Sequence, residues 1–135
     1  MKKVLVAAPL SAGLSEFLVK SNYELIGYDA GTHSACDLRE VVGIVTSNKL
    51  LLDQTALLHY PDLRWIARLG SGMEIIDTAW CDQQGIRYFS SPAGIANAVA
   101  EHVTGMLLSL LHKIGLANNQ IREGHWVREA NRGTE

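Results

Sequence analysis

A glycine turn is the stretch of this 135-residue sequence with the clearest chemical potential. Arg68 and Leu69 are followed by Gly70, Ser71 and Gly72. Glycines let the backbone approach a ligand closely, and successive amides near the start of a helix can hold a carboxylate or a phosphate. The turn therefore predicts an anion site. Strand-to-helix turns often contain two glycines, so the spacing alone leaves a purely structural role open.

A second polar loop, Thr46-Ser47-Asn48, follows the preceding apolar run. It offers backbone amides, a hydroxyl and the side-chain amide of Asn48. In an open parallel sheet such loops meet at the carboxyl edge, where ligands bind. We expect Asn48 to face the same crevice as the glycine turn, and ordinary turn chemistry is the alternative.

Other chemistries find no support in the sequence. The Gly70 turn lacks the third glycine of a dinucleotide fingerprint and follows the fourth predicted strand, not the first. The histidines show no metal-type spacing with Cys36 or Cys81, and no Gly-x-Ser-x-Gly elbow occurs. Glu101 and His102 are neighbours on a predicted helix, so they point about 100° apart and cannot face one substrate together.

The elements that must position these loops alternate in type. Apolar runs at 4–8, 23–28, 42–45, 63–68 and 86–89 predict five strands. Helical spacing and capping residues predict helices over 11–20, 37–41, 53–58 and 77–84, the last ended by a left-handed Gly85. This alternation predicts an α/β fold with a doubly wound parallel sheet of about five strands. An antiparallel α+β domain is the alternative.

A long apolar helix is predicted over 97–113, after a loop at 90–95. Its stripe comprises Val99, Val103, Met106, Leu107, Leu110, Leu111 and Ile114. Because Ala100, Gly105 and Leu108 interrupt the opposite face, we expect the helix to pack on two sides and to self-associate through Ala98–Ile114. The predicted division is a sheet domain over 1–95, the long helix over 96–115, and a helix and linker over 116–135.

Composition excludes several classes of partner. With 12 Lys+Arg against 14 Asp+Glu and no run of like charges, nucleic acid is not an expected partner. No apolar stretch reaches the ~20 residues of a membrane span. The two separated cysteines and the absence of a signal-peptide pattern predict a reduced, cytoplasmic protein.

Several runs together closely resemble the D-isomer-specific 2-hydroxyacid dehydrogenases. They are Leu63–Asp77, Gly85-Ile86, Ser91-Pro92, Asn97–His102, Gly105–Leu110 and Ile121–Trp126. The likeness extends from roughly residue 40 to the end with matched spacing, and in detail it is greatest to the D-3-phosphoglycerate dehydrogenase branch.

The resemblance implies a flavodoxin-like substrate domain and hydride transfer between NAD and a D-2-hydroxy acid, with 3-phosphoglycerate of serine biosynthesis as one candidate. Family members hold the substrate carboxylate on amides of the glycine loop, which assigns substrate binding to Gly70, Ser71 and Gly72, helped by Asn48. Val99 corresponds to a position that touches the nicotinamide. The long helix corresponds to part of the family's dimer interface, which implies a homodimer.

Two positions depart from the family pattern, and the catalytic groups are missing. Ile95 replaces an asparagine that can reach the substrate, and Ser47 replaces an arginine that could meet a phosphate. The family's nucleotide fingerprint, catalytic arginine, glutamate and acid/base histidine would all follow Glu135. We therefore expect an N-terminal fragment that is inactive alone. A non-catalytic flavodoxin-like module that binds a small carboxylate is the alternative.

Overall fold

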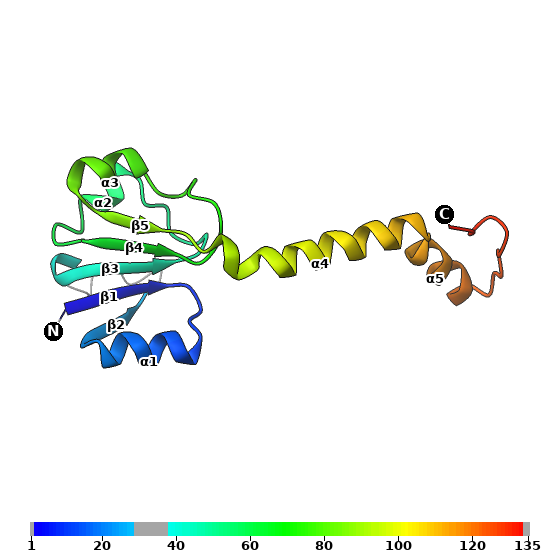
Figure 1. Ribbon diagram of the computed structural model, residues 1–135, viewed down its shortest axis with the longest axis horizontal. Coiled ribbons are helices and arrows are strands. Elements are labelled where there is room, and N and C mark those ends of the chain that lie inside the picture. The colour runs from blue at the N-terminus through cyan, green and yellow to red at the C-terminus, as the bar shows by residue number, and fades with distance from the viewer. Residues whose placement is uncertain (1, 29–37, 134–135) are drawn as a thin grey trace. The chain divides into compact units, whose positions relative to one another are not determined.

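The computed structural model describes residues 2–28 and 38–133, which include a five-stranded sheet. The strands lie in the order β2-β1-β3-β4-β5, and every neighbouring pair is parallel (Figure 1). Their bounds are β1 (Lys2–Ala7), β2 (Tyr23–Gly27), β3 (Val41–Thr46), β4 (Trp65–Arg68) and β5 (Arg87–Phe89). The predicted parallel sheet is confirmed, and the antiparallel alternative is wrong.

Three helices of the sheet unit begin where a polar side chain caps the first turn. Ser11 Oγ accepts a hydrogen bond at the start of α1 (Ala12–Lys20), and Asp53 and Asp77 do the same for α2 (Gln54–Leu57) and α3 (Thr78–Gln84). Helix α3 ends at Gly85, whose φ of 69° is the left-handed conformation expected from the sequence.

The helix predicted over 37–41 is shorter than expected. A 3-10 turn covers Leu38–Glu40, and Val41 already belongs to β3. The apolar run of β3 extends through Val41, so strand pairing takes precedence over the helical turn at this position. Asp37, where the predicted helix began, lies outside the described residues.

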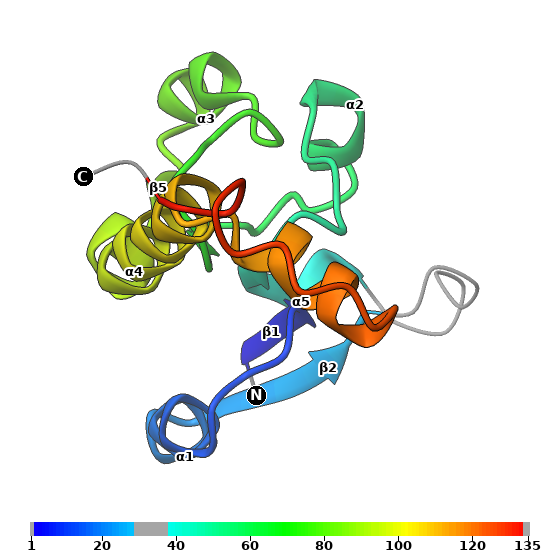
Figure 2. The same ribbon diagram turned by 90° about the vertical axis from the view of Figure 1, so that its right-hand side faces the viewer.

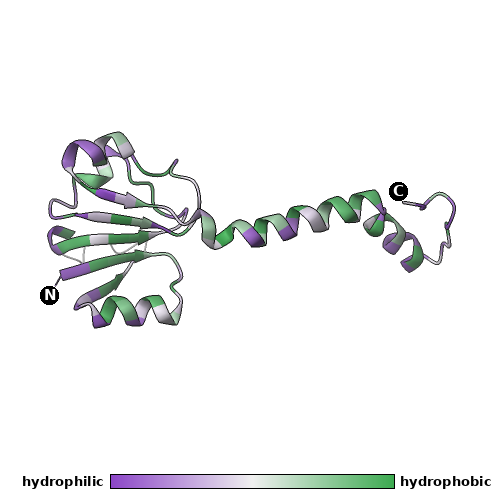
Figure 3. Cartoon of the chain, in the orientation of Figure 1, coloured by the Kyte–Doolittle hydropathy of each residue, from purple (hydrophilic) through white to green (hydrophobic). Residues whose placement is uncertain are grey.

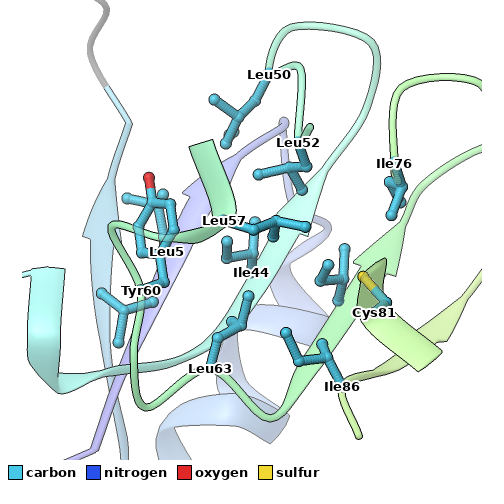
Figure 4. Close-up of a cluster of buried hydrophobic side chains, with 13 residues drawn as sticks. Leu5, Ile44, Leu50, Leu52, Leu57, Tyr60, Leu63, Ile76, Cys81 and Ile86 are labelled. Carbon is cyan, nitrogen blue, oxygen red and sulfur yellow. The ribbon is translucent and has the colours of Figure 1, made fainter. Parts of the chain in front are cut away.

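Helices cover both faces of the sheet, as a doubly wound fold requires. Helix α1 lies against one face, while α2 and α3 lie on the other (Figure 2). Under α1, Leu18 packs with Val4 and Val45. The larger cluster, under α2 and α3, includes Leu5, Ile44, Leu52, Leu57, Tyr60, Leu63, Ile76, Cys81 and Ile86 (Figure 4). The core therefore lies on both sides of β3, all of whose residues are buried.

The chain divides into two compact units, Met1–Gly94 and Ile95–Glu135. Helix α4 (Pro92–Leu111) begins in the first unit and supplies most of the second, followed by α5 (Ile114–Arg122). The loop predicted at 90–95 is wrong over 92–95, because these residues are helical. Proline suits the first position of a helix, where its missing N–H has no partner to lose.

Helix α4, in the second unit, consists largely of apolar residues (Figure 3). None of the residues of α4 is buried, and its large apolar side chains are exposed. Among the described residues, α4 is also the one helix long and apolar enough to cross a membrane by length and composition. After α5 the chain returns toward this helix pair, because Lys113 Nζ donates to Ala130 O at 2.6 Å and Asn131 Nδ2 donates to Gln120 Oε1 at 2.5 Å.

Candidate carboxylate-binding site

Three loops meet at the carboxyl edge of the sheet, after β3, β4 and β5. The amide of Leu69 donates to the carbonyl of Thr46 at 2.7 Å, which ties the loop after β4 to the loop after β3. The amide of Ser91 donates to the carbonyl of Gly70 at 2.8 Å, which joins the loop after β4 to the loop after β5. The glycine turn is therefore held from both sides.

A second set of bonds joins two of these loops further along. Leu52 and Ile76 form a parallel bridge outside the sheet. The amide of Leu52 donates to Ile75 O at 2.7 Å, and the amide of Asp77 donates to Leu52 O at 2.9 Å. Because Leu52 and Ile76 are both buried, this bridge anchors the two loops to the core.

The glycine turn presents two successive backbone amides that donate to no other described residue. The amide of Gly70 donates to Arg68 O at 3.1 Å, but within residues 2–28 and 38–133 those of Ser71 and Gly72 donate no hydrogen bond. Ser71 is exposed and Gly72 is partly exposed. Two adjacent N–H groups at the edge of a sheet can bind both oxygens of a carboxylate.

The predicted substrate residues all lie at this edge. Gly70, Ser71 and Gly72 form the turn after β4, and Asn48 lies exposed on the neighbouring loop after β3. Ser47 Oγ donates to Asn48 Oδ1 at 3.5 Å, a long contact that leaves the Asn48 side chain available to a ligand. Their roles in binding stay predictions.

A half-buried ion pair adjoins the turn, and the sequence reasoning missed it. Arg68, at the end of β4, has a side chain only 10% exposed. Its guanidinium donates to the carbonyl of Gly72, and its Nη2 donates to Glu74 Oε1 at 2.8 Å. The sequence signal was a cation at the end of an apolar strand with an acid six residues further on.

The two glycines leave space for this pair. A Cβ on Gly70 would lie 3.1 Å from Arg68 Nη1, which is tighter than ordinary contact. A Cβ on Gly72 would overlap the carboxylate of Glu74. The glycines therefore accommodate the ion pair as well as exposing the amides.

Two buried polar atoms at this edge have no hydrogen-bond partner within the described part of the chain. They are Thr46 Oγ1 and Arg68 Nε. Thr46 and Arg68 are register partners on the neighbouring strands β3 and β4, so their side chains lie on the same face of the sheet. Burying polar groups without partners costs stability, so the core alone does not account for this pair.

Comparison with known proteins identifies the family. The family model for the catalytic domain of D-isomer specific 2-hydroxyacid dehydrogenases matches residues 4–130. The chain belongs to this family. A D-3-phosphoglycerate dehydrogenase of Archaeoglobus fulgidus is 30% identical over 136 residues, which cover 98% of this chain and 26% of the relative.

Solved dehydrogenase structures share the fold. The NADPH-dependent glyoxylate/hydroxypyruvate reductase of Sinorhizobium meliloti, in complex with NADP and malonate, is 28% identical with a TM-score of 0.73, over 94% of this chain and 40% of the reductase. The D-lactate dehydrogenase of Aquifex aeolicus, complexed with NAD and lactic acid, is 20% identical with a TM-score of 0.81, over 98% of this chain and 41% of that enzyme. This chain therefore spans from a quarter to two fifths of the length of these dehydrogenases.

Only one residue was predicted to contact the family's nicotinamide cofactor. No Gly-x-Gly-x-x-Gly fingerprint occurs in the 135 residues. Val99, the predicted nicotinamide contact, lies on α4 in the second unit with 52% of its surface exposed, and offers one apolar contact. Among the described residues no group of three His, Cys, Asp or Glu side chains could hold a metal ion.

Proposed function

We propose that this chain is the substrate-binding part of an NAD-dependent D-2-hydroxyacid dehydrogenase, and that the amides of Ser71 and Gly72 bind the substrate carboxylate. The observation that carries the proposal is that the amides of Ser71 and Gly72, at the carboxyl edge of the sheet, donate to no other described residue. The chain that presents them belongs to the D-isomer specific 2-hydroxyacid dehydrogenase family. The 2-hydroxy or 2-oxo acid would also meet Asn48. In this proposal NAD binds elsewhere, with Val99 as the one contact from this chain.

The size of the substrate is inferred from the loop after β3 and from the family pattern. Ser47 on that loop has no charge to meet a phosphate, and Ile95 on α4 lacks the polar group that the family pattern has there. One relative is named as a D-3-phosphoglycerate dehydrogenase and another as a glyoxylate/hydroxypyruvate reductase. We include 3-phosphoglycerate as a candidate, and we expect D-glycerate to bind at least as tightly because no phosphate site accompanies the amides.

Amide-resolved NMR tests the carboxylate site. The 15N-labelled chain is titrated with D-lactate and, in parallel, with D-lactamide, which has the same shape without the charge. We expect saturable shifts of the Ser71 and Gly72 amides with D-lactate and none with D-lactamide. Equal responses to the two compounds, or shifts confined to other residues, would contradict the proposal.

A matched pair of variants separates the Ser71 amide from the side chain. Ser71→Pro removes the N–H, whereas Ser71→Ala keeps it and removes only the hydroxyl. We expect the proline variant to weaken D-lactate binding by about tenfold, the value of roughly one charge-assisted hydrogen bond. The alanine variant should bind like the unmodified chain.

A test of hydride transfer requires a chimeric enzyme. Residues 4–130 would replace the matching segment of the Archaeoglobus fulgidus relative, with NADH oxidation followed on hydroxypyruvate and other 2-oxo acids. Turnover that Ser71→Pro abolishes would support the proposal. A folded chimera that binds NADH and reduces no 2-oxo acid would contradict it.

The cellular setting completes the proposal. We propose a cytoplasmic homodimer joined through Ala98–Ile114, with no nucleic acid or membrane partner. The exposed apolar surface of α4 supports self-association.

A further inference from the structure

We propose that Arg68 is a positioning residue for the carboxylate site: it holds the glycine turn through the carbonyl of Gly72 and supplies the positive charge beside the amides. This inference rests on the proposed function, because it concerns how the same amides bind their anion. Arg68 does not touch the substrate in this proposal, since its side chain lies beneath the turn and is only 10% exposed.

The first step is geometric. In a trans peptide the C=O and the following N–H point in opposite directions. Because Gly70 O accepts from the Ser91 amide, the N–H of Ser71 points away from the loop after β5. Because Gly72 O accepts from Arg68, the N–H of Met73 points away from the guanidinium. The peptides on both sides of the Ser71–Gly72 bond are therefore held by hydrogen bonds, and Arg68 supplies the one on the Gly72 side.

The second step is electrostatic. The guanidinium carries a positive charge and is buried. Glu74, its acidic partner among the described residues, has a side chain that is 67% exposed, so water screens the carboxylate more than it screens Arg68. The carboxylate of Glu74 lies next to Gly72, so the two charges oppose each other at the amides of Ser71 and Gly72, and the buried guanidinium supplies the attraction for an anion. The positive potential of a guanidinium favours an anion over a neutral ligand of the same shape.

The third step concerns why a cation is buried here at all. An apolar side chain of similar size is often at least as stable as a buried ion pair. Arg68 Nε has no partner within the described residues, so hydrogen bonding within the fold does not fully compensate the charge. A role in anion binding explains why the end of β4 carries an arginine.

Substitutions at both partners test the proposal in opposite directions. Arg68→Met removes the charge and the hydrogen bond to Gly72, and should weaken D-lactate binding by about tenfold, seen at the Ser71 and Gly72 amides. Glu74→Gln keeps an acceptor for Arg68 and removes the countercharge, so it should tighten binding by about threefold. A purely structural role for the pair predicts no gain from Glu74→Gln.

The exposed pair on α1 supplies charge-matched controls. Lys20 Nζ lies 3.5 Å from Glu16 Oε2, and both side chains are exposed. Lys20→Met and Glu16→Gln change the net charge of the chain by the same amounts as the test variants. Both should bind D-lactate like the unmodified chain, and the difference between D-lactate and D-lactamide should shrink only in Arg68→Met.

Arg68→Lys covers the case in which Arg68→Met does not fold. Lysine keeps the charge but not the two-pronged donor geometry, so Arg68→Lys should bind D-lactate more weakly than the unmodified chain, while Glu74→Gln should still bind it more tightly. If the unmodified chain binds D-lactate but neither Arg68 variant weakens binding, or Glu74→Gln leaves it unchanged, this inference is overturned and the proposed function stands. If the unmodified chain shows no binding at these amides, both are overturned.

Discussion

The sheet unit and the helical unit differ in how they treat apolar side chains. Ile44 and Ile66 in the sheet have no exposed surface, whereas Leu110 on α4 is 76% exposed. The sheet unit therefore closes its core with its own helices, while the apolar face of α4 has no cover within its own unit. An apolar surface of this kind generally marks an interface, so the two units have different requirements for stability.

The largest effect is expected where a core side chain is truncated. Ile66→Ala leaves a cavity between the sheet and α3 and should lower the free energy of unfolding by about 2–5 kcal/mol. Leu110→Ala is the matched control and should cost less than about 0.5 kcal/mol at concentrations where the chain is monomeric. Urea unfolding measures both, and equal losses would remove the distinction between the units.

A charge on α4 tests whether the exposed apolar face of this helix is an interface. Leu110→Glu should raise the dissociation constant of the self-associated chain at least about tenfold, because the interface would bury an unpaired carboxylate. Sedimentation equilibrium measures this, with Asn118→Glu on α5 as the charge-matched control. A strictly monomeric unmodified chain at high concentration would contradict the dimer, and its co-flotation with phosphatidylcholine vesicles would indicate a membrane partner.

A smaller effect is expected at the polar edge of the sheet core. Thr46→Val replaces an unpartnered buried hydroxyl by a methyl group and should stabilise the chain by about 0.5–1 kcal/mol. Thr46→Ser keeps the hydroxyl and removes a methyl group, so it should destabilise by about 1 kcal/mol. Thermal unfolding distinguishes the two signs, and a loss of stability in Thr46→Val would mean that the hydroxyl has a partner.

The smallest expected effect is a change in the free energy of unfolding at alkaline pH. Burial, followed by the charges of Asp77 and Asp82, raises the pKa of the Cys81 thiol above its ordinary value. As pH rises through the ordinary thiol pKa, the unfolded chain loses this proton before the folded chain does, so stability falls with pH. The free energy of unfolding, measured between roughly pH 8 and 10, should fall less steeply in Cys81→Ala. An unchanged slope would contradict the assignment.

The sheet was predictable because its signals are local. Apolar runs such as that of β3 specify strands, and side chains such as Ser11 and Asp77 specify where helices begin. The start of α4 was not predictable from its apolar stripe, because Pro92, Ala93 and Gly94 carry no helical periodicity. The helix begins at Pro92, and proline is favoured at the first position of a helix.

The site was only partly predictable. The glycine turn identified the amides, since glycines at a strand end are readable in sequence. The burial of Arg68 and its bonds to Gly72 and Glu74 depend on how the turn folds back over β4, which no spacing rule encodes. The tie from Ser91 to Gly70 likewise joins segments that only the sheet order brings together.

The bridge between Leu52 and Ile76 has a consequence for the entropy of binding. The amides of Leu52 and Asp77 donate to backbone carbonyls across this bridge, so their hydrogen exchange should be slow, while the amides of Ser71 and Gly72 exchange rapidly. The base of the glycine turn is thus ordered before any ligand arrives. A small acid that binds there loses its own translational freedom but has little loop disorder to remove, so even a few contacts can give measurable affinity.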